Sequence, residues 1–252
     1  MIYLKSRAEI DTMRRASVIV AEVLQTLKET VKPGMTTLDL DEVAERMTYE
    51  RGAKPAFKGY SVGGRVFNHS LCTSINEEIV HGIPSDRVLK EGDILSMDFG
   101  VVYEGFYGDS AVTVGLGQVS SEAERLMQVT ETALNEGIET LREGNRLGDL
   151  GSTIQGIAER SGYSVVREFV GHGIGKKLHE EPPVPNYGDA GKGCRLRAGM
   201  VLAVEPMVNA GKKEISILED GWTAVTRDRS LAAHFEHSIA ITADGPFVLS
   251  RL

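Results

Sequence analysis

Several features that would mark a special class of protein are missing from this sequence of 252 residues. It has only two cysteines, Cys72 and Cys194, which are too few for a disulfide framework and too far apart for a zinc knuckle. No run approaches the roughly 18 apolar residues that a membrane-spanning helix needs, and the N-terminus lacks the apolar core of a signal peptide. We therefore expect a cytoplasmic protein that does not act in a membrane.

A basic surplus is missing as well, since 28 lysines and arginines face 36 acids and give a formal net charge of −8. Binding to nucleic acid needs a basic face, so this balance argues against a nucleic-acid partner and favours cations. The hydrophobic share of 41% and the charged share of 25% are those of an ordinary globular chain. No linker or low-complexity stretch divides it, and we expect one domain over residues 1–252.

Instead, the sequence contains an internal recurrence. Ser6 and Glu9 have the spacing of a helix capping box, and Ser121 and Glu124 repeat it. Four residues then recur 110 positions later: Gly34, Asp39, Leu40 and Gly52 correspond to Gly144, Asp149, Leu150 and Gly162. This order of helix and turn signals indicates a duplication.

The second part of the recurrence concerns two acidic residues. LKEGDILSMD, which ends at Asp98, matches LRAGMVLAVE, which ends at Glu205, at an offset of 107. Two copies are too few for a solenoid, so we predict two similar α/β halves, about 1–118 and 119–252, that face each other across a pseudo-twofold axis. The two acids would then meet at the centre. A chance recurrence of glycine, β-type run and acid is the alternative.

The segment GDILSMDFGVVYEGFYGDSAVTVG predicts a β-hairpin with Glu104 and Gly105 in its turn. In that register Asp109 lies opposite Gly100, and Asp98 lies on the same face as its diagonal neighbour. Two acids so close repel each other unless a cation lies between them. The alternative is a pair of solvated acids, but the apolar flanks make this a poor exposed strand.

Further polar residues follow in order along the chain. GHGIGKKLHEEP contains His172 and His179, while Glu236 lies in RSLAAHFEHSIAIT, which predicts a final strand entering the core. Its neighbours His234 and His237 are expected on other faces. Carboxylates with one imidazole make an oxygen-rich site suited to two divalent ions, and four carboxylates match their charge.

The ordered segments HGIP, the Asp98 and Asp109 pair, GHGIGKKLHEEP, EPMVNAGKKE with DGWT, and FEHSIAIT resemble type I methionine aminopeptidases. The resemblance covers essentially the whole chain. It implies an α+β pita-bread fold, in which two pseudo-twofold related halves surround a curved antiparallel sheet with helices on its outer face. It also implies a dinuclear metal hydrolase that removes the initiator methionine from nascent proteins when the second residue is small.

The same resemblance implies individual roles. The metal ligands would be Asp98, Asp109, His172, Glu205 and Glu236, with Asp109 and Glu236 bridging two divalent ions of Co, Mn, Fe, Zn or Ni. His81 and His179 would steady the scissile amide, and Glu205 would also shuttle a proton. The substrate methionine would contact Phe57, Tyr60, Cys72, Leu178, Trp222 and His81.

The chain departs from the family pattern in the stretch SVGGRVFNHSL between Tyr60 and Cys72, which is about four residues longer than usual. Phe67 is a candidate for a further pocket aromatic, and His69 is expected to be solvated. Plain core packing is the alternative for Phe57 and Tyr60, and a small buried hydrophobe for Cys72. Cys72 is not expected to be a nucleophile, because the sequence shows no histidine partner for it.

Nascent polypeptide N-termini are the expected substrates, and we expect a monomer. Docking on the ribosome stays open, and the acidic balance gives it no support. Two rival interpretations are a proline-directed or creatinase-like relative of the same fold, which usually carries an N-terminal domain, and a binding protein that has lost its metal ligands. All five ligand positions are filled here.

Overall fold

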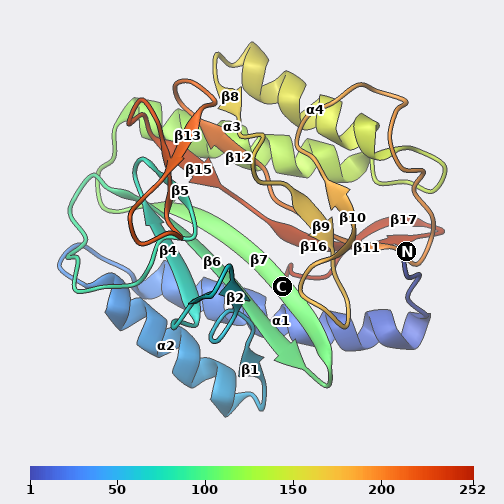
Figure 1. Ribbon diagram of the computed structural model, residues 1–252, viewed down its shortest axis with the longest axis horizontal. Coiled ribbons are helices and arrows are strands. Elements are labelled where there is room, and N and C mark those ends of the chain that lie inside the picture. The colour runs from blue at the N-terminus through green and yellow to red at the C-terminus, as the bar shows by residue number, and fades with distance from the viewer.

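The computed structural model describes all residues, 1–252, with four helices packed against antiparallel sheets (Figure 1). The helices are α1 Arg7–Thr30, α2 Thr37–Glu50, α3 Ser121–Glu139 and α4 Leu147–Arg160. Helices α1 and α2 precede the strands of the first half, and α3 and α4 precede those of the second (Figure 1). The α+β class predicted from the sequence is confirmed.

The strands of the first half are β1 Lys54–Pro55, β2 Ser61–Val62, β3 Arg65–Val66, β4 Leu71–Ile75, β5 Glu78–Val80, β6 Ile94–Tyr103 and β7 Phe106–Gly115. Those of the second half are β8 Ser164–Val165, β9 Gly171–Gly173, β10 Glu180–Val184, β11 Val201–Val204, β12 Met207–Asn209, β13 Ile215–Ile217, β14 Ala224–Thr226, β15 Ala232–His234, β16 His237–Thr242 and β17 Gly245–Val248.

Local signals explain where the helices begin. The hydroxyl of Ser6 accepts from the backbone N–H of Glu9, whose carboxylate accepts in return from the N–H of Ser6, which is the predicted capping box. The predicted capping residue of α3, Ser121, is wrong by one residue. Its N-cap is Ser120, whose hydroxyl accepts from the N–H of Ala123, because a serine in extended conformation at that position already satisfies the first turn.

Corresponding glycines of the recurrence have the same backbone conformation. Gly34 and Gly144 have φ of 95° and 97°, and Gly92 and Gly199 have φ of 88° and 90°. These left-handed values are costly for any residue with a Cβ. The recurrence therefore extends from the residue types to the backbone.

The centre of the molecule is built from two sheets that meet edge to edge. One contains β4, β6 and β7 with β1, and the other has the order β10-β9-β11-β16-β17. The backbones of Ala111 in β7 and Glu236 exchange hydrogen bonds of 2.9 and 3.4 Å, which join the sheets. Glu236 thus lies between β15 and β16, and β17 follows, so the prediction of one final strand through Glu236 is wrong: the chain leaves one sheet and enters another there.

Apolar side chains pack separately beneath each pair of helices. Met13, Val20, Leu24 and Leu27 of α1 face the sheet and are buried. Helix α3 packs in the same way against β12, β15 and β17. None of the helices is long and apolar enough to pass through a membrane.

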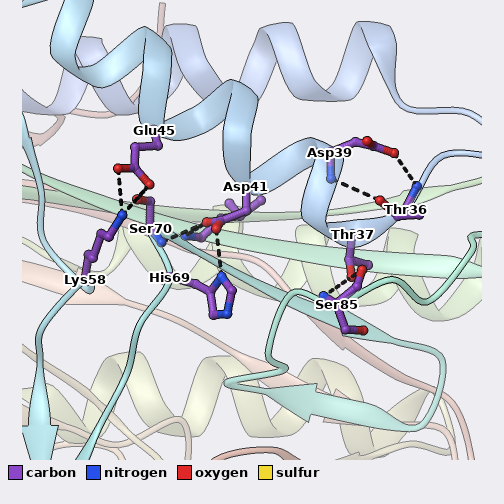
Figure 2. A network of polar contacts seen from close by, with 10 residues as sticks. Thr36, Thr37, Asp39, Asp41, Glu45, Lys58, His69, Ser70 and Ser85 are labelled. Atoms are coloured by element: carbon purple, nitrogen blue, oxygen red, sulfur yellow. Dashed lines mark hydrogen bonds and ion pairs between the residues drawn. The ribbon is translucent and has the colours of Figure 1, made fainter.

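The stretch between Tyr60 and Cys72 is fastened to α2 by a polar network (Figure 2). The carboxylate of Asp41 accepts from the backbone N–H of Ser70 at 2.8 Å and of Leu71 at 2.9 Å, and it meets Nδ1 of His69 at 2.8 Å. The expectation that His69 is solvated is therefore wrong. A buried carboxylate on the neighbouring helix, which the local sequence does not reveal, holds its ring.

Candidate active site

The hairpin of β6 and β7 has the predicted turn and register. Glu104 and Gly105 occupy the turn with φ of 48° and 79°, and Gly100 pairs with Asp109 while Asp98 pairs with Ala111. Two positive φ values in a two-residue loop match the right-handed twist of the strands. The two carboxylates therefore lie on one face of the hairpin.

Strands from the second half bring further acids and a histidine to this face. Asp109, His172 and Glu236 offer ligand atoms that all lie within 4.8 Å of one another. Glu205 follows β11, and its Oε1 lies 3.6 Å from Nε2 of His172. Asp98, Asp109, His172, Glu205 and Glu236 are called the floor below.

The floor is rigid because its backbone is bonded across the two sheets. The hydroxyl of Ser238 donates to the carbonyl of Asp109 at 2.8 Å, and the hydroxyl of Ser110 donates to the carbonyl of Glu236 at 2.6 Å. Asp109 and Glu236 are 4% and 2% exposed. Neighbouring serines thus hold the two acids side by side.

The carboxylates of the floor are short of partners. Asp98, Asp109 and Glu236 each have a buried oxygen that accepts no hydrogen bond. Burial raises the pKa of Asp98 to about 7, and burial with the neighbouring acids raises the pKa values of Asp109 and Glu236 well above normal. The pKa of Glu205 is likewise raised well above normal by burial and then by Asp98 and Asp109. Such a cluster is stable as anions only around cations.

His172 is oriented as a ligand. Its Nδ1 lies 2.9 Å from the carbonyl oxygen of Gly173, to which a ring proton on Nδ1 donates. That bond leaves the lone pair of Nε2 directed at the floor, which is the usual arrangement of a metal-binding histidine. Burial, with the nearby His179, lowers the pKa of His172 to about 4 and keeps the ring neutral.

Two other histidines face the same cavity. The hydroxyl of Tyr60 lies 2.9 Å from Nδ1 of His179, so a proton donated there leaves Nε2–H of His179 as a donor. His81 has a φ of 61°, a strained value for a residue with a Cβ, and its ring lies edge-on to Phe169 at 5.2 Å. Burial lowers the pKa of His81 to about 4, with a further contribution from His179.

All residues predicted for the site line one cavity of about 450 Å³. They are Phe57, Tyr60, Cys72, His81, Asp98, Asp109, His172, Leu178, His179, Glu205, Trp222 and Glu236. The cavity has an apolar wall, with Phe57, Cys72 and Leu178 buried. Cys72 pairs with Asp98 across β4 and β6, and burial raises the pKa of its thiol well above normal, so it is an unreactive wall residue.

The cavity also contains residues that the sequence left out. They are Val62, Gly63, Arg65, Phe67, Phe169, Ile217 and Gly221. Phe67 was only a candidate, and its ring packs edge-on against Trp222 at 5.4 Å. The alternation of apolar residues could have indicated Phe67 as buried, but nothing local pointed to the others. Tyr60, Val62, Gly63, Arg65, Ile217, Gly221 and Trp222 are called the mouth below.

His234 was expected on another face, and this is wrong. It is 1% exposed, its Nε2 lies 3.9 Å from Oε2 of Glu205, and neither ring nitrogen has a partner. His234 lies two residues before Glu236, and alternating side chains at that spacing share a face, so His234 faces the acids as Glu236 does. His237 does point away, with Nδ1 at 2.8 Å from the hydroxyl of Ser250.

Comparison with known proteins gives consistent results. The model of metallopeptidase family M24 matches residues 11–243. A curated methionine aminopeptidase of Clostridium perfringens is 50% identical over 252 residues, and methionine aminopeptidase 1 of Bacillus subtilis is 48% identical, each covering 100% of both chains.

Solved structures agree with these relatives. A methionine aminopeptidase from Thermotoga maritima has a TM-score of 0.97 at 44% identity, with 100% of both chains covered. A prolidase from Pyrococcus horikoshii has a TM-score of 0.78 at 23% identity and is covered over only 63% of its chain. The second likeness shows the fold alone.

Proposed function

The chain belongs to metallopeptidase family M24, and on that basis we propose that it is a methionine aminopeptidase, a hydrolase that removes the initiator methionine from new polypeptides. The observation that carries the proposal is one cavity in which unpaired buried acids adjoin an apolar and aromatic wall. The acids suit divalent metal, and the wall suits a thioether side chain. A small residue after the methionine is the preferred substrate.

The floor fits two divalent ions. Asp98, Asp109, His172, Glu205 and Glu236 would hold them. Three of these residues offer ligand atoms within 4.8 Å of one another. The unpartnered carboxylate oxygens of the floor accept no hydrogen bond and are therefore free to bind metal. A pair of ions there would lower the pKa of a water between them and polarise the scissile carbonyl.

The remaining polar residues bind the peptide and move its proton. His81 and His179 donate hydrogen bonds to the carbonyl oxygen of the substrate and stabilise the negative charge that develops on it. For this role each imidazole has to be neutral and fixed in orientation. Phe169 fixes His81, and Tyr60 fixes His179. Glu205 accepts a proton from the attacking water and gives it to the leaving amine.

The methionine side chain lies against Phe57, Tyr60, Cys72, Leu178, Trp222 and His81. Polarizable sulfur makes favourable contacts with aromatic rings, and these residues supply three of them besides the imidazole. The wall is closed by Phe67, which backs Trp222. An unbranched thioether therefore fits better than a polar or charged N-terminal residue.

The site lies between the two duplicated halves of a single domain, about 1–118 and 119–252. The junction of the sheets at Ala111 and Glu236 supports this position of the site, because it brings acids of both halves together. The protein acts as a monomer in the cytoplasm on nascent chains.

The proposal is tested by removing metal and restoring Mn(II), Fe(II), Co(II), Ni(II) or Zn(II) one at a time. Release of the N-terminal residue is then measured by mass spectrometry on Met-Ala, Met-Leu and Ala-Pro peptides. We expect metal-dependent loss of methionine from the Met-Ala peptide above all. Cleavage of the Ala-Pro peptide alone would assign a proline-directed activity, and no cleavage with any metal would contradict an enzymatic function.

A further inference from the structure

The stretch that is longer than the family pattern forms a small hairpin at the mouth of the cavity. Strands β2 and β3 pair through Ser61 with Val66 and Val62 with Arg65, and the turn residues Gly63 and Gly64 have φ of 58° and 82°. Its base is fixed by the buried Phe67, whose N–H donates to the carbonyl of Tyr60 at 2.9 Å. The hairpin is therefore a defined element on an anchored base.

This hairpin places exposed apolar side chains beside the cavity. Val62 is 56% exposed and lines the cavity together with Ile217 from β13, which is 49% exposed. Exposed aliphatic residues are unremarkable singly, but two that face one cavity form a surface for a ligand side chain. A peptide chain that leaves the cavity on this side passes these two residues.

The same hairpin carries the one lysine or arginine that lines the cavity, Arg65. Its guanidinium rests on Gly221, in the space where any other residue would have its Cβ. The charge also lowers the pKa of Asp220, although hydrogen bonds from Thr223 and Trp222 contribute more. Arg65 thus spans the mouth from the hairpin to the turn that carries Trp222.

Arg65 has donors to spare. Its side chain forms no hydrogen bond or ion pair. The neighbouring acid, Asp220, accepts instead from the N–H groups of Trp222 and Thr223 and from the hydroxyl of Thr223. A guanidinium presents five N–H donors in a planar fork that matches a carboxylate. The only other charged residues in the cavity are the acids of the floor, so Arg65 is the one positively charged side chain of the lining that can pair with a carboxylate.

We propose that the hairpin of residues 61–66 is a substrate-selecting element, in which Arg65 binds a carboxylate within the first few residues after the scissile bond. Val62 and Ile217 contact the intervening chain. Each residue of an extended peptide spans about 3.3 to 3.6 Å, so the position of an acid along the peptide determines how far its carboxylate lies from the scissile bond. The inference rests on the proposed aminopeptidase activity and adds a preference beyond the second residue.

The test compares C-terminally amidated peptides Met-Ala-Xaa-Ser-Gly and Met-Ala-Ser-Xaa-Gly, where Xaa is Asp, Asn or Lys. We expect the wild-type protein to cleave the Asp peptide with a kcat/KM about two- to fivefold above that of the Lys peptide at one of the two positions, the range of an exposed ion pair. The ratio should fall towards one at high salt. Free-acid Asn peptides distinguish a terminal carboxylate from a side-chain one.

Variants then assign the preference. Arg65→Ala should bring the Asp to Lys ratio to about one, Arg65→Glu should reverse it, and Arg65→Lys should keep part of it. The matched control is Arg197→Glu, a charge reversal at an exposed residue outside the cavity, which should leave the ratio unchanged. Equal ratios in the wild type and Arg65→Glu would overturn the inference, whereas absence of methionine release from every peptide would instead overturn the proposed activity.

Discussion

The floor and the mouth of the cavity differ in how they are held. On the floor, Asp109 and Glu236 are almost fully buried, and serine side chains bond their backbones across two sheets. At the mouth, Val62 and Arg65 are exposed on a short hairpin whose base is anchored by Phe67. The floor is therefore held by the sheets, whereas the proposed selection of the peptide rests on a peripheral hairpin.

Replacing a floor ligand should give the largest effect. His172→Ala removes the imidazole that faces Glu205, and we expect weaker binding at one metal position with a fall in kcat/KM on the order of a thousandfold. The strand backbone of β9 is unchanged, so the melting temperature of the metal-free protein should stay within a few degrees. Calorimetric metal titration with peptide kinetics checks this, and full activity would sink the ligand assignment.

The next largest effect should come from a residue that borders the floor without binding metal. His81→Ala removes a proposed donor to the scissile carbonyl, and we expect a fall in kcat of about a hundredfold with metal binding retained. Phe169→Leu, which removes only the ring that packs on His81, is the matched control and should cost less. Unchanged kcat/KM in His81→Ala would remove its role.

Much of the floor could be predicted from sequence because strand rules act over short distances. The spacing of Asp98 and Asp109 and the Glu104 and Gly105 turn determine a register in which both acids share a face, and the structure has that register. The recurrence that ends in Asp98 and Glu205 located a second acid at the same cavity. Only the resemblance to a family supplied the individual roles.

The residues that escaped prediction are those placed by tertiary contacts. His69 is held by Asp41 of α2, whereas His234 is an exception, because its spacing of two residues from Glu236 already places both on one face. Arg65 enters the cavity only because a hairpin folds over Gly221. No periodicity in the sequence records which distant helix or turn a loop will meet.

A smaller effect should be seen in how the stability of the metal-free protein depends on pH, because the acids of the floor titrate there. The raised pKa of Asp98, about 7 when folded, means that the folded metal-free protein binds a proton more tightly than the unfolded chain. The contribution of Asp98 to the stability of the metal-free protein is therefore greatest below about pH 4, and it is lost as the pH rises towards 7. We expect added metal to raise the melting temperature by several degrees more at pH 8 than at pH 5.

Calorimetry with and without Mn(II) measures this difference, and Asp98→Asn provides the matched control. That variant removes one titrating acid, so the decline in metal-free stability between pH 5 and pH 8 should be less steep. An equal decline in both proteins would show that acids elsewhere govern the pH dependence.

The smallest effect on turnover should come from the support of the mouth. Asp41→Ala leaves the backbone N–H groups of Ser70 and Leu71 and the ring of His69 without their acceptor (Figure 2), and lost acceptors of this kind cost about 1 to 3 kcal/mol of unfolding free energy. Because Phe67 and Trp222 lie beyond this anchor, KM for Met-Ala peptides should rise a few-fold. The value of kcat should change little, since the serines that hold Asp109 and Glu236 are untouched. Asp41→Asn keeps an acceptor oxygen and should lose less, so an equal fall of kcat in both variants would mean that the mouth and the floor are one mechanical unit.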